Sequence, residues 1–130
     1  MSRNVVLELP DDYPVQVALS QNGNNIASGA KKGFAPIVIA GTIIRVQVDC
    51  DPANEPSAAA VQVDCNKINR STGTATSILS SVASIPTGAN TGTGTINGTQ
   101  TVVDGDALTF DVDQGSDGKE LVVSVIIRPS

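Results

Sequence analysis

Residues 101–114 have the sequence TVVDGDALTFDVDQ, and the second half of this stretch decides the fold class. Leu108, Phe110 and Val112 alternate there with polar residues, and a period of two puts all three on one face of a β-strand. The segment 103–106 is typical of a turn, because an Asp side chain can bond its own backbone and Gly tolerates positive φ. The stretch therefore predicts a turn followed by a half-buried strand.

A second alternating run occupies residues 120–128, after a turn at residues 114–118 that contains two glycines. Its apolar face would consist of Leu121, Val123, Val125 and Ile127. Two strands joined by a short connection that contains Gly are typical of a β-hairpin. We therefore expect residues 101–114 and 120–128 to pair with each other.

The same alternation recurs along the rest of the chain. It gives strand candidates at residues 4–9, 15–19, 35–40, 42–50 and 58–67. In the last two, the inward faces would be Ile44, Val46, Val48 and Cys50 in one strand and Val61, Val63 and Cys65 in the other. Residues 77–85 have a poor phase, so a short helical turn is an alternative there. Residues 86–98 predict either a long loop or a weak edge strand.

About eight short strands predict an all-β protein with a single antiparallel β-sandwich, jelly-roll-like, and little or no helix. The length of 130 residues suits one structural domain. Within it, residues 36–130 would form the sandwich, and residues 1–35 would be either two N-terminal strands or an extended arm. The core must be aliphatic, because the chain has two Phe, one Tyr and no Trp.

Composition argues against two classes of partner. The net charge is −5 and the eight basic residues are scattered, whereas nucleic-acid binding needs clustered Lys and Arg. The N-terminus lacks the features of a signal peptide, and no apolar run approaches the ~20 residues of a membrane span. We therefore expect no nucleic-acid partner, no membrane association, and a protein made in a cytoplasm.

The residues also argue against catalysis. There is no His, and neither Cys50 nor Cys65 has a basic neighbour in sequence that would activate it. We expect no enzyme and no cofactor, and we interpret the two cysteines as buried thiols, with a disulfide as the alternative. A calcium ion held by Asp111, Asp113 and Asp117 is the weaker alternative to solvated turns, because their spacing is not that of an EF-hand loop.

Several segments, in this order, resemble one known family. They are VDCNKIN at residues 63–69, IPTGAN at residues 85–90, and VDGDALTFDVDQ at residues 103–114 with the strand that follows. From residue 41 to residue 127, the chain resembles the β-sandwich module of tailed-bacteriophage structural proteins. It departs from the family at residues 67–73, where members often have Asn-Gly after the lysine and this chain has a longer insertion.

The resemblance implies a non-enzymatic virion protein: a decoration or cement protein that binds the outer surface of a phage head and stabilises it. The expected partner is the major capsid protein, the expected state is a homotrimer, and assembly would take place in the host cytoplasm. We expect docking to use the apolar segment Val5, Val6 and Leu7 and the two spare aromatic residues, Tyr13 and Phe34. The alternative is a receptor- or carbohydrate-binding module of a tail fibre or head fibre.

Overall fold

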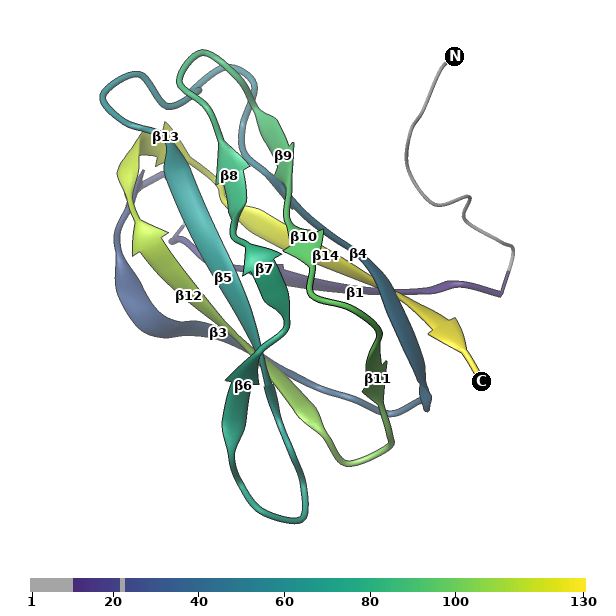
Figure 1. The fold of residues 1–130 in the computed structure, drawn as a ribbon. Helices are drawn as coiled ribbons and strands as arrows, with labels where there is room; N and C mark the ends of the chain where they lie inside the picture. The colour runs from purple at the N-terminus through teal and green to yellow at the C-terminus, as the bar shows by residue number, and fades with distance from the viewer. Residues whose placement is uncertain (1–10, 22) are drawn as a thin grey trace.

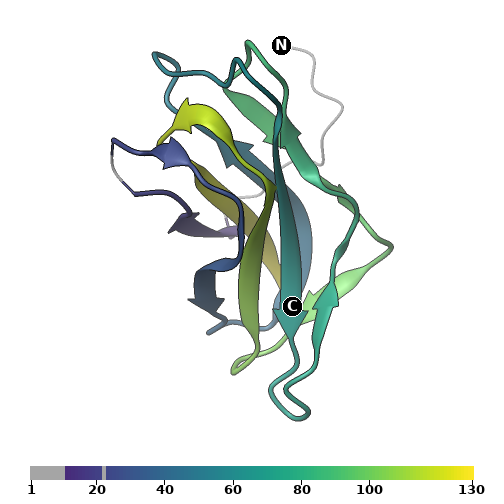
Figure 2. The same cartoon turned by 90° about the vertical axis from the view of Figure 1, so that its left-hand side faces the viewer.

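Two antiparallel β-sheets pack face to face in the computed structural model, which describes residues 11–21 and 23–130 (Figure 1). The first sheet has the order β1 (Tyr13–Ala18), β14 (Val122–Pro129), β4 (Gly41–Asp49) and β11 (Gln100–Val102), with β9 (Thr91–Thr93) also paired to β4. The second has the order β3 (Gly29–Pro36), β12 (Ala107–Gln114), β5 (Val61–Ile68) and β6 (Ala75–Ser77), with β8 (Ala83–Ile85) also paired to β5. In Figure 2, β12 and β5 run in front of β14 and β4.

Two small sheets complete the fold. β2 (Asn25–Ile26) pairs with β13 (Ser116–Lys119), and β7 (Leu79–Ser81) pairs with β10 (Thr95–Ile96). The predicted β-sandwich is confirmed, and the described residues contain no helix, so none could cross a membrane. The predicted count of about eight strands is too low, because fourteen strand segments form within residues 11–21 and 23–130. Apart from β2 and β13, which pair only with each other, these segments occupy eight positions, since β6 to β8 and β9 to β11 are interrupted strands. The two sheet orders are those of a jelly roll.

The predicted hairpin between residues 101–114 and 120–128 is wrong. β12 pairs with β3 and β5, whereas β14 pairs with β1 and β4, so the two strands lie in different sheets. The connection between them forms β13, which pairs with β2 and carries the chain from one sheet to the other. A Cβ on Gly115 would lie 2.3 Å from the carbonyl oxygen of Ile26, so this glycine serves a close crossing rather than a hairpin turn.

The inward face of β4 changes phase near its start. Ile43 is 2% exposed, whereas Ile44, which we expected to point inward, is only half-buried. Pairing with β14 shifts at this point, from Arg45 opposite Ile126 to Ile43 opposite Ile127. The extra residue is a β-bulge, which moves the remaining side chains to the other face of the strand. The predicted inward residues from Val46 onward are buried.

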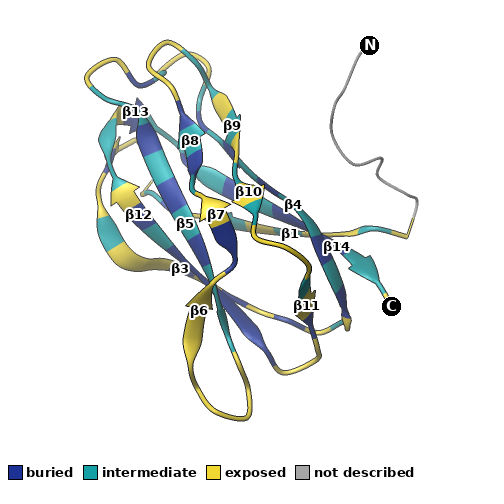
Figure 3. Ribbon diagram, viewed as in Figure 1, coloured by how far each residue is buried: buried dark blue, intermediate teal, exposed yellow. Residues whose placement is uncertain are grey.

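Burial alternates along β5, as Figure 3 shows, whereas β12 also buries Thr109 and β14 also buries Ile126 between their inward residues. Phe110 is fully buried in β12 and lies opposite Cys65 of β5. Both cysteines are buried and free, so no disulfide forms between Cys50 and Cys65. Burial raises the pKa of both thiols, most strongly at Cys65.

The sequence left two structures open for residues 77–85 and for residues 86–98, and both segments contain β-strands. Residues 75–85 form three short strands in place of a helical turn, and residues 91–96 form β9 and β10. Gly92 and Gly94 face the interior here: a Cβ on Gly92 would lie 1.8 Å from the carbonyl oxygen of Ser84, and one on Gly94 would lie 2.9 Å from a methyl carbon of Leu79. The glycines therefore let one sheet close against the other along this edge, while Thr91, Thr93 and Thr95 stay exposed.

Residues 13–36 contribute to both sheets. β1 pairs with β14 along its whole length, and β3 pairs with β12. The predicted strand at residues 4–9 lies outside the described residues, as do the predicted docking residues Val5, Val6 and Leu7.

Candidate functional site

The antiparallel order gives the sandwich two distinct ends. At one end, β1 and β4 begin and β3, β11 and β14 finish, which brings together residues 11–13, the loop 37–40 and the turn 103–106. At the other end lie the loop 19–24, β2 and β13. Figure 1 shows the C-terminus near the start of β4, on the side opposite β13.

The first end carries every large hydrophobic side chain that is exposed in the described residues. Tyr13 is 39% exposed, Phe34 62%, Val38 63% and Val103 48%. The loops of the two valines are adjacent, because Ile37 donates its N–H to the carbonyl oxygen of Asp106 and accepts the N–H of Gly105, at 2.8 and 2.9 Å. We call these four residues the apolar end. It includes Tyr13 and Phe34, which the sequence analysis names as expected docking residues. It also includes Val38 and Val103, which the sequence analysis does not name.

A salt bridge fixes the chain beside Tyr13. Arg128 of β14 binds Asp12 through two parallel contacts of 3.1 Å, from Nε to Oδ1 and from Nη2 to Oδ2. The Asp12 side chain is 4% exposed, and its carboxylate raises the pKa of Arg128. The chain before residue 11 therefore joins the sandwich at the apolar end.

Asp106 holds the turn of the apolar end in place. Its carboxylate is buried and accepts the backbone N–H groups of Val103 and Arg70, at 3.0 and 3.2 Å. The bond from Arg70 ties the turn 103–106 to the loop 69–74. In that loop the side chain of Asn69 accepts two further N–H groups, and Gly73 has a φ of +73°. The loop 69–74 is thus a turn that hydrogen bonds hold beside the apolar end.

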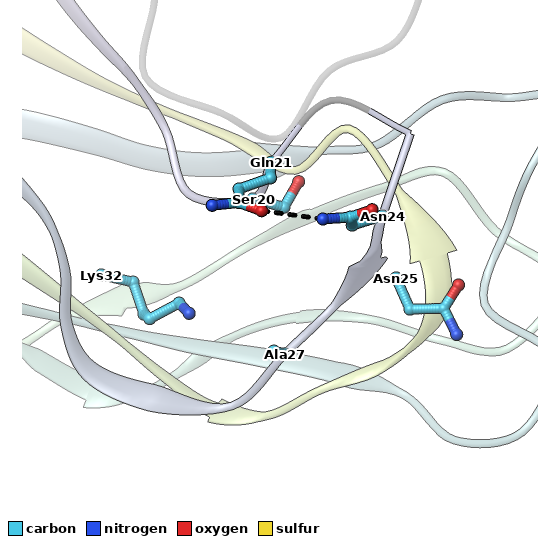
Figure 4. A pocket seen from close by; sticks show the side chains of 6 residues that line it. All are labelled: Ser20, Gln21, Asn24, Asn25, Ala27 and Lys32. Carbon is cyan, nitrogen blue, oxygen red and sulfur yellow. Dashed lines mark hydrogen bonds between the residues drawn. The ribbon is translucent and has the colours of Figure 1, made fainter.

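The opposite end has a polar hollow of about 250 Å³ (Figure 4). We call it the lysine hollow; its lining residues are Ser20, Gln21, Asn24, Asn25, Ala27 and Lys32. A neighbouring hollow of about 380 Å³ shares three of these residues and adds Lys31. This site was not predicted from the sequence, because its residues come from a turn and a strand that only the topology brings together.

A bulge in β3 presents the two lysines. Gly33 lies opposite Phe110 and Gly29 lies opposite Val112, so three residues of β3 face one residue of β12. Lys31 sits in the bulge with a φ of +51°, and its N–H donates to Oδ1 of Asp111 at 2.8 Å. A non-glycine residue at positive φ is uncommon, and such positions cluster at functional sites.

The three aspartates of the calcium alternative do not form one group. Asp111 also accepts Nδ2 of Asn66 at 3.0 Å, and Asp113 lies near it on the outer face of β12, where partial burial and the charges of Asp64 and Asp111 raise its pKa. Asp117 lies on β13 and binds the loop that contains Ser57. Across residues 11–21 and 23–130, no three acidic or thiol side chains are placed to hold a metal ion.

No protein-family model, curated protein or solved structure significantly matches this chain.

Proposed function

We propose that this protein is a non-enzymatic structural protein of a virion, which decorates the outer surface of a tailed-phage head and stabilises the shell. The sequence resemblance to phage sandwich modules and the jelly-roll fold support this function. The observation that carries it is the apolar end, which has all four exposed large hydrophobic side chains of the described residues, two of them on the hydrogen-bonded loops of Val38 and Val103. Grouped exposed hydrophobic residues mark sites of protein–protein contact more often than single ones do.

The apolar end is suited to anchoring. Fully burying one such side chain stabilises a complex by roughly 1.5–3 kcal/mol, so four of them supply a useful part of a binding free energy. Aromatic residues are enriched among the residues that dominate interfaces, and Tyr13 and Phe34 are the only aromatic side chains outside the core. The proposed partner of this surface is the major capsid protein.

We further propose that residues 1–10 extend the same attachment. They join the sandwich at the apolar end, and a segment of ten residues reaches up to about 35 Å. Their apolar residues Val5, Val6 and Leu7 suit addition of a strand to a neighbour or insertion into a groove. A homotrimer would present three such attachments at once, and linked sites bind far more tightly than a single one.

The test is binding of the purified protein to heads of its phage that lack it. Replacing Phe34 and Val38 with serine should leave the melting temperature unchanged, because both side chains are exposed. It should weaken co-sedimentation with the heads by at least about tenfold, the effect expected of central interface residues. Ala30→Ser is the matched control, since Ala30 is exposed at the other end of the same strand. Equal occupancy for wild type and the double variant would contradict docking through the apolar end.

A receptor- or carbohydrate-binding module of a tail or head fibre is the second candidate. The lysine hollow favours it, because the hollow is lined by amide and ammonium groups. The two functions are compatible, since the hollow and the apolar end lie at opposite ends of the sandwich.

A further inference from the structure

The lysine hollow contains positive charge that the protein leaves uncompensated. Among the residues that the structure describes, Lys67 donates to the carbonyl oxygen of Thr101 and Lys119 to Oδ1 of Asn25, at 2.9 and 2.7 Å. Over the same part of the chain, the ammonium groups of Lys31 and Lys32 make no hydrogen bond or ion pair. In a protein of net charge −5, two adjacent cations beside a hollow create a local potential that attracts anions.

Nearby carboxylates are already engaged. Glu120 accepts the backbone N–H of Gly23 at 2.9 Å, and Asp111 accepts the N–H of Lys31 and the amide of Asn66. These bonds hold the loop and the bulge in shape. They leave the lysine ammonium groups as the charged donors of the hollow.

The amides of the hollow are oriented by their neighbours. Asn24 donates from Nδ2 to Oε1 of Gln21 at 2.8 Å, which points the Nε2 donors of Gln21 elsewhere. Oδ1 of Asn25 accepts the ammonium of Lys119, which leaves its Nδ2 to donate. Ser20 accepts the N–H of Leu121 at 2.8 Å and keeps its own hydroxyl proton. Fixed donors of this kind suit hydroxyl and carboxylate oxygens.

Lys32 extends across the hollow. Its Cδ lies 3.0 Å from the position that a Cβ on Gly29 would occupy, so the missing side chain of Gly29 makes room for the lysine stem. Figure 4 shows the ammonium of Lys32 pointing toward the space between Ala27 and the asparagines. A ligand that fills this hollow and reaches the neighbouring one would therefore meet the charged groups of Lys32 and Lys31 and several neutral donors.

We propose that the lysine hollow binds an acidic saccharide. Its carboxylate lies against Lys31 and Lys32, and its hydroxyl groups bond Gln21, Asn24 and Asn25. The hollow is close in size to small-molecule sites, which span roughly 300–1,000 Å³. This inference does not depend on attachment through the apolar end, because the two sites lie at opposite ends of the molecule.

The experiment is a titration of the isolated protein, followed by ¹⁵N–¹H NMR spectroscopy and calorimetry. Trigalacturonic acid is the probe, maltotriose is the neutral control of the same length, and inorganic phosphate is the bare anion. We expect trigalacturonic acid to shift the amide signals of residues 20–32 and to bind more weakly as salt is added, since salt screens exposed charges. Maltotriose and phosphate should bind at least about fivefold more weakly, a loss of roughly 1 kcal/mol.

Two variants and one control complete the test. Lys32→Gln and Gln21→Ala should each weaken binding of trigalacturonic acid several-fold while the melting temperature stays unchanged. Arg70→Gln makes the same charge change at the other end of the sandwich and should bind as wild type does. The proposal is overturned if trigalacturonic acid shifts no signal in the hollow, if phosphate binds equally well, or if Arg70→Gln weakens binding as much as Lys32→Gln.

Discussion

Asp117 is an acidic residue whose role is structural. Its Oδ1 accepts the N–H groups of Ser57 and Ala58 at 2.8 and 3.1 Å and the hydroxyl of Ser116 at 3.0 Å, while its Oδ2 accepts the hydroxyl of Ser57. These bonds favour the charged form and hold the pKa of Asp117 well below its usual value. Asp117 therefore ties the proline-containing loop before β5 to β13.

This geometry predicts how stability depends on pH. Because the pKa of Asp117 is lower in the folded state, its stabilising effect is complete above the unfolded pKa of about 3.9 and is lost as the pH falls below that value. Asp117→Asn should lower the melting temperature clearly at pH 7, and the difference from wild type should shrink steadily between pH 4 and pH 2. Calorimetry at a series of pH values measures both effects.

Asp104→Asn is the control, because Asp104 is exposed and no bond to its carboxylate is present in the described residues. It makes the same change of charge and should alter the melting temperature little at either pH. A difference between wild type and Asp117→Asn that stays constant from pH 7 to pH 2 would show that the carboxylate does not act through its charge.

At the scale of single residues, the sequence shows which acidic side chains are present but not what each of them does in the fold. Asp106 and Asp117 both belong to acidic groups that suggest metal or catalytic chemistry when they are seen as spacing alone. In the structure each accepts backbone N–H groups from a segment far away in sequence. Only the tertiary fold supplies those donors, so no local pattern distinguishes such a carboxylate from a ligand.

At the scale of elements, the closed edge of the sandwich depends on glycine. Residues 91–95, TGTGT, have the composition of a flexible loop, yet they form strand segments whose glycines pack inward. Gly92→Ala would place a methyl group against the carbonyl of Ser84, and neither backbone can move without breaking the pairing of β9 with β4. We expect a loss of about 1–3 kcal/mol of stability, the usual cost of overpacking.

Urea unfolding followed by circular dichroism checks this prediction. Thr93→Ala is the control, because Thr93 is exposed in the same strand, and it should change stability by less than about 0.5 kcal/mol. If Gly92→Ala unfolds at the same urea concentration as wild type, β9 does not lie against Ser84.

Alternation in sequence predicts strands and their buried faces better than it predicts partners. The residues expected to point inward in β5, β12 and β14 are buried, because each long strand packs one side against the other sheet, although Thr109, expected on the outer face, is buried as well. The hairpin prediction fails because a turn with glycine fits a crossing as well as a reversal. The predicted inward face of β4 is wrong at Ile44, because a β-bulge shifts the pairing there. The bulge depends on the partner strand, which is not visible in the sequence.

At the scale of the whole molecule, the fold separates two surfaces. Tyr13 and Phe34 could be singled out from the sequence as docking candidates, since they are aromatic residues outside the strongest strand patterns, and the structure shows both of them exposed. Val38 and Val103 could not be predicted as exposed: Val38 lies in an apolar run that resembles a buried strand, and Val103 is the first residue of the turn 103–106. The lysine hollow also required the topology, which places the loop after β1 beside the bulge of β3.

The central proposal is that the protein attaches to the phage head by the apolar end and displays the lysine hollow at the opposite end. The most direct measurement is a cryo-EM reconstruction of purified phage particles that carry the protein. We predict density for the sandwich at three-fold or quasi-three-fold positions of the head, with the apolar end toward the shell and the lysine hollow facing outward. Density found only on the tail, or a sandwich attached to the head by the hollow end, would contradict the account.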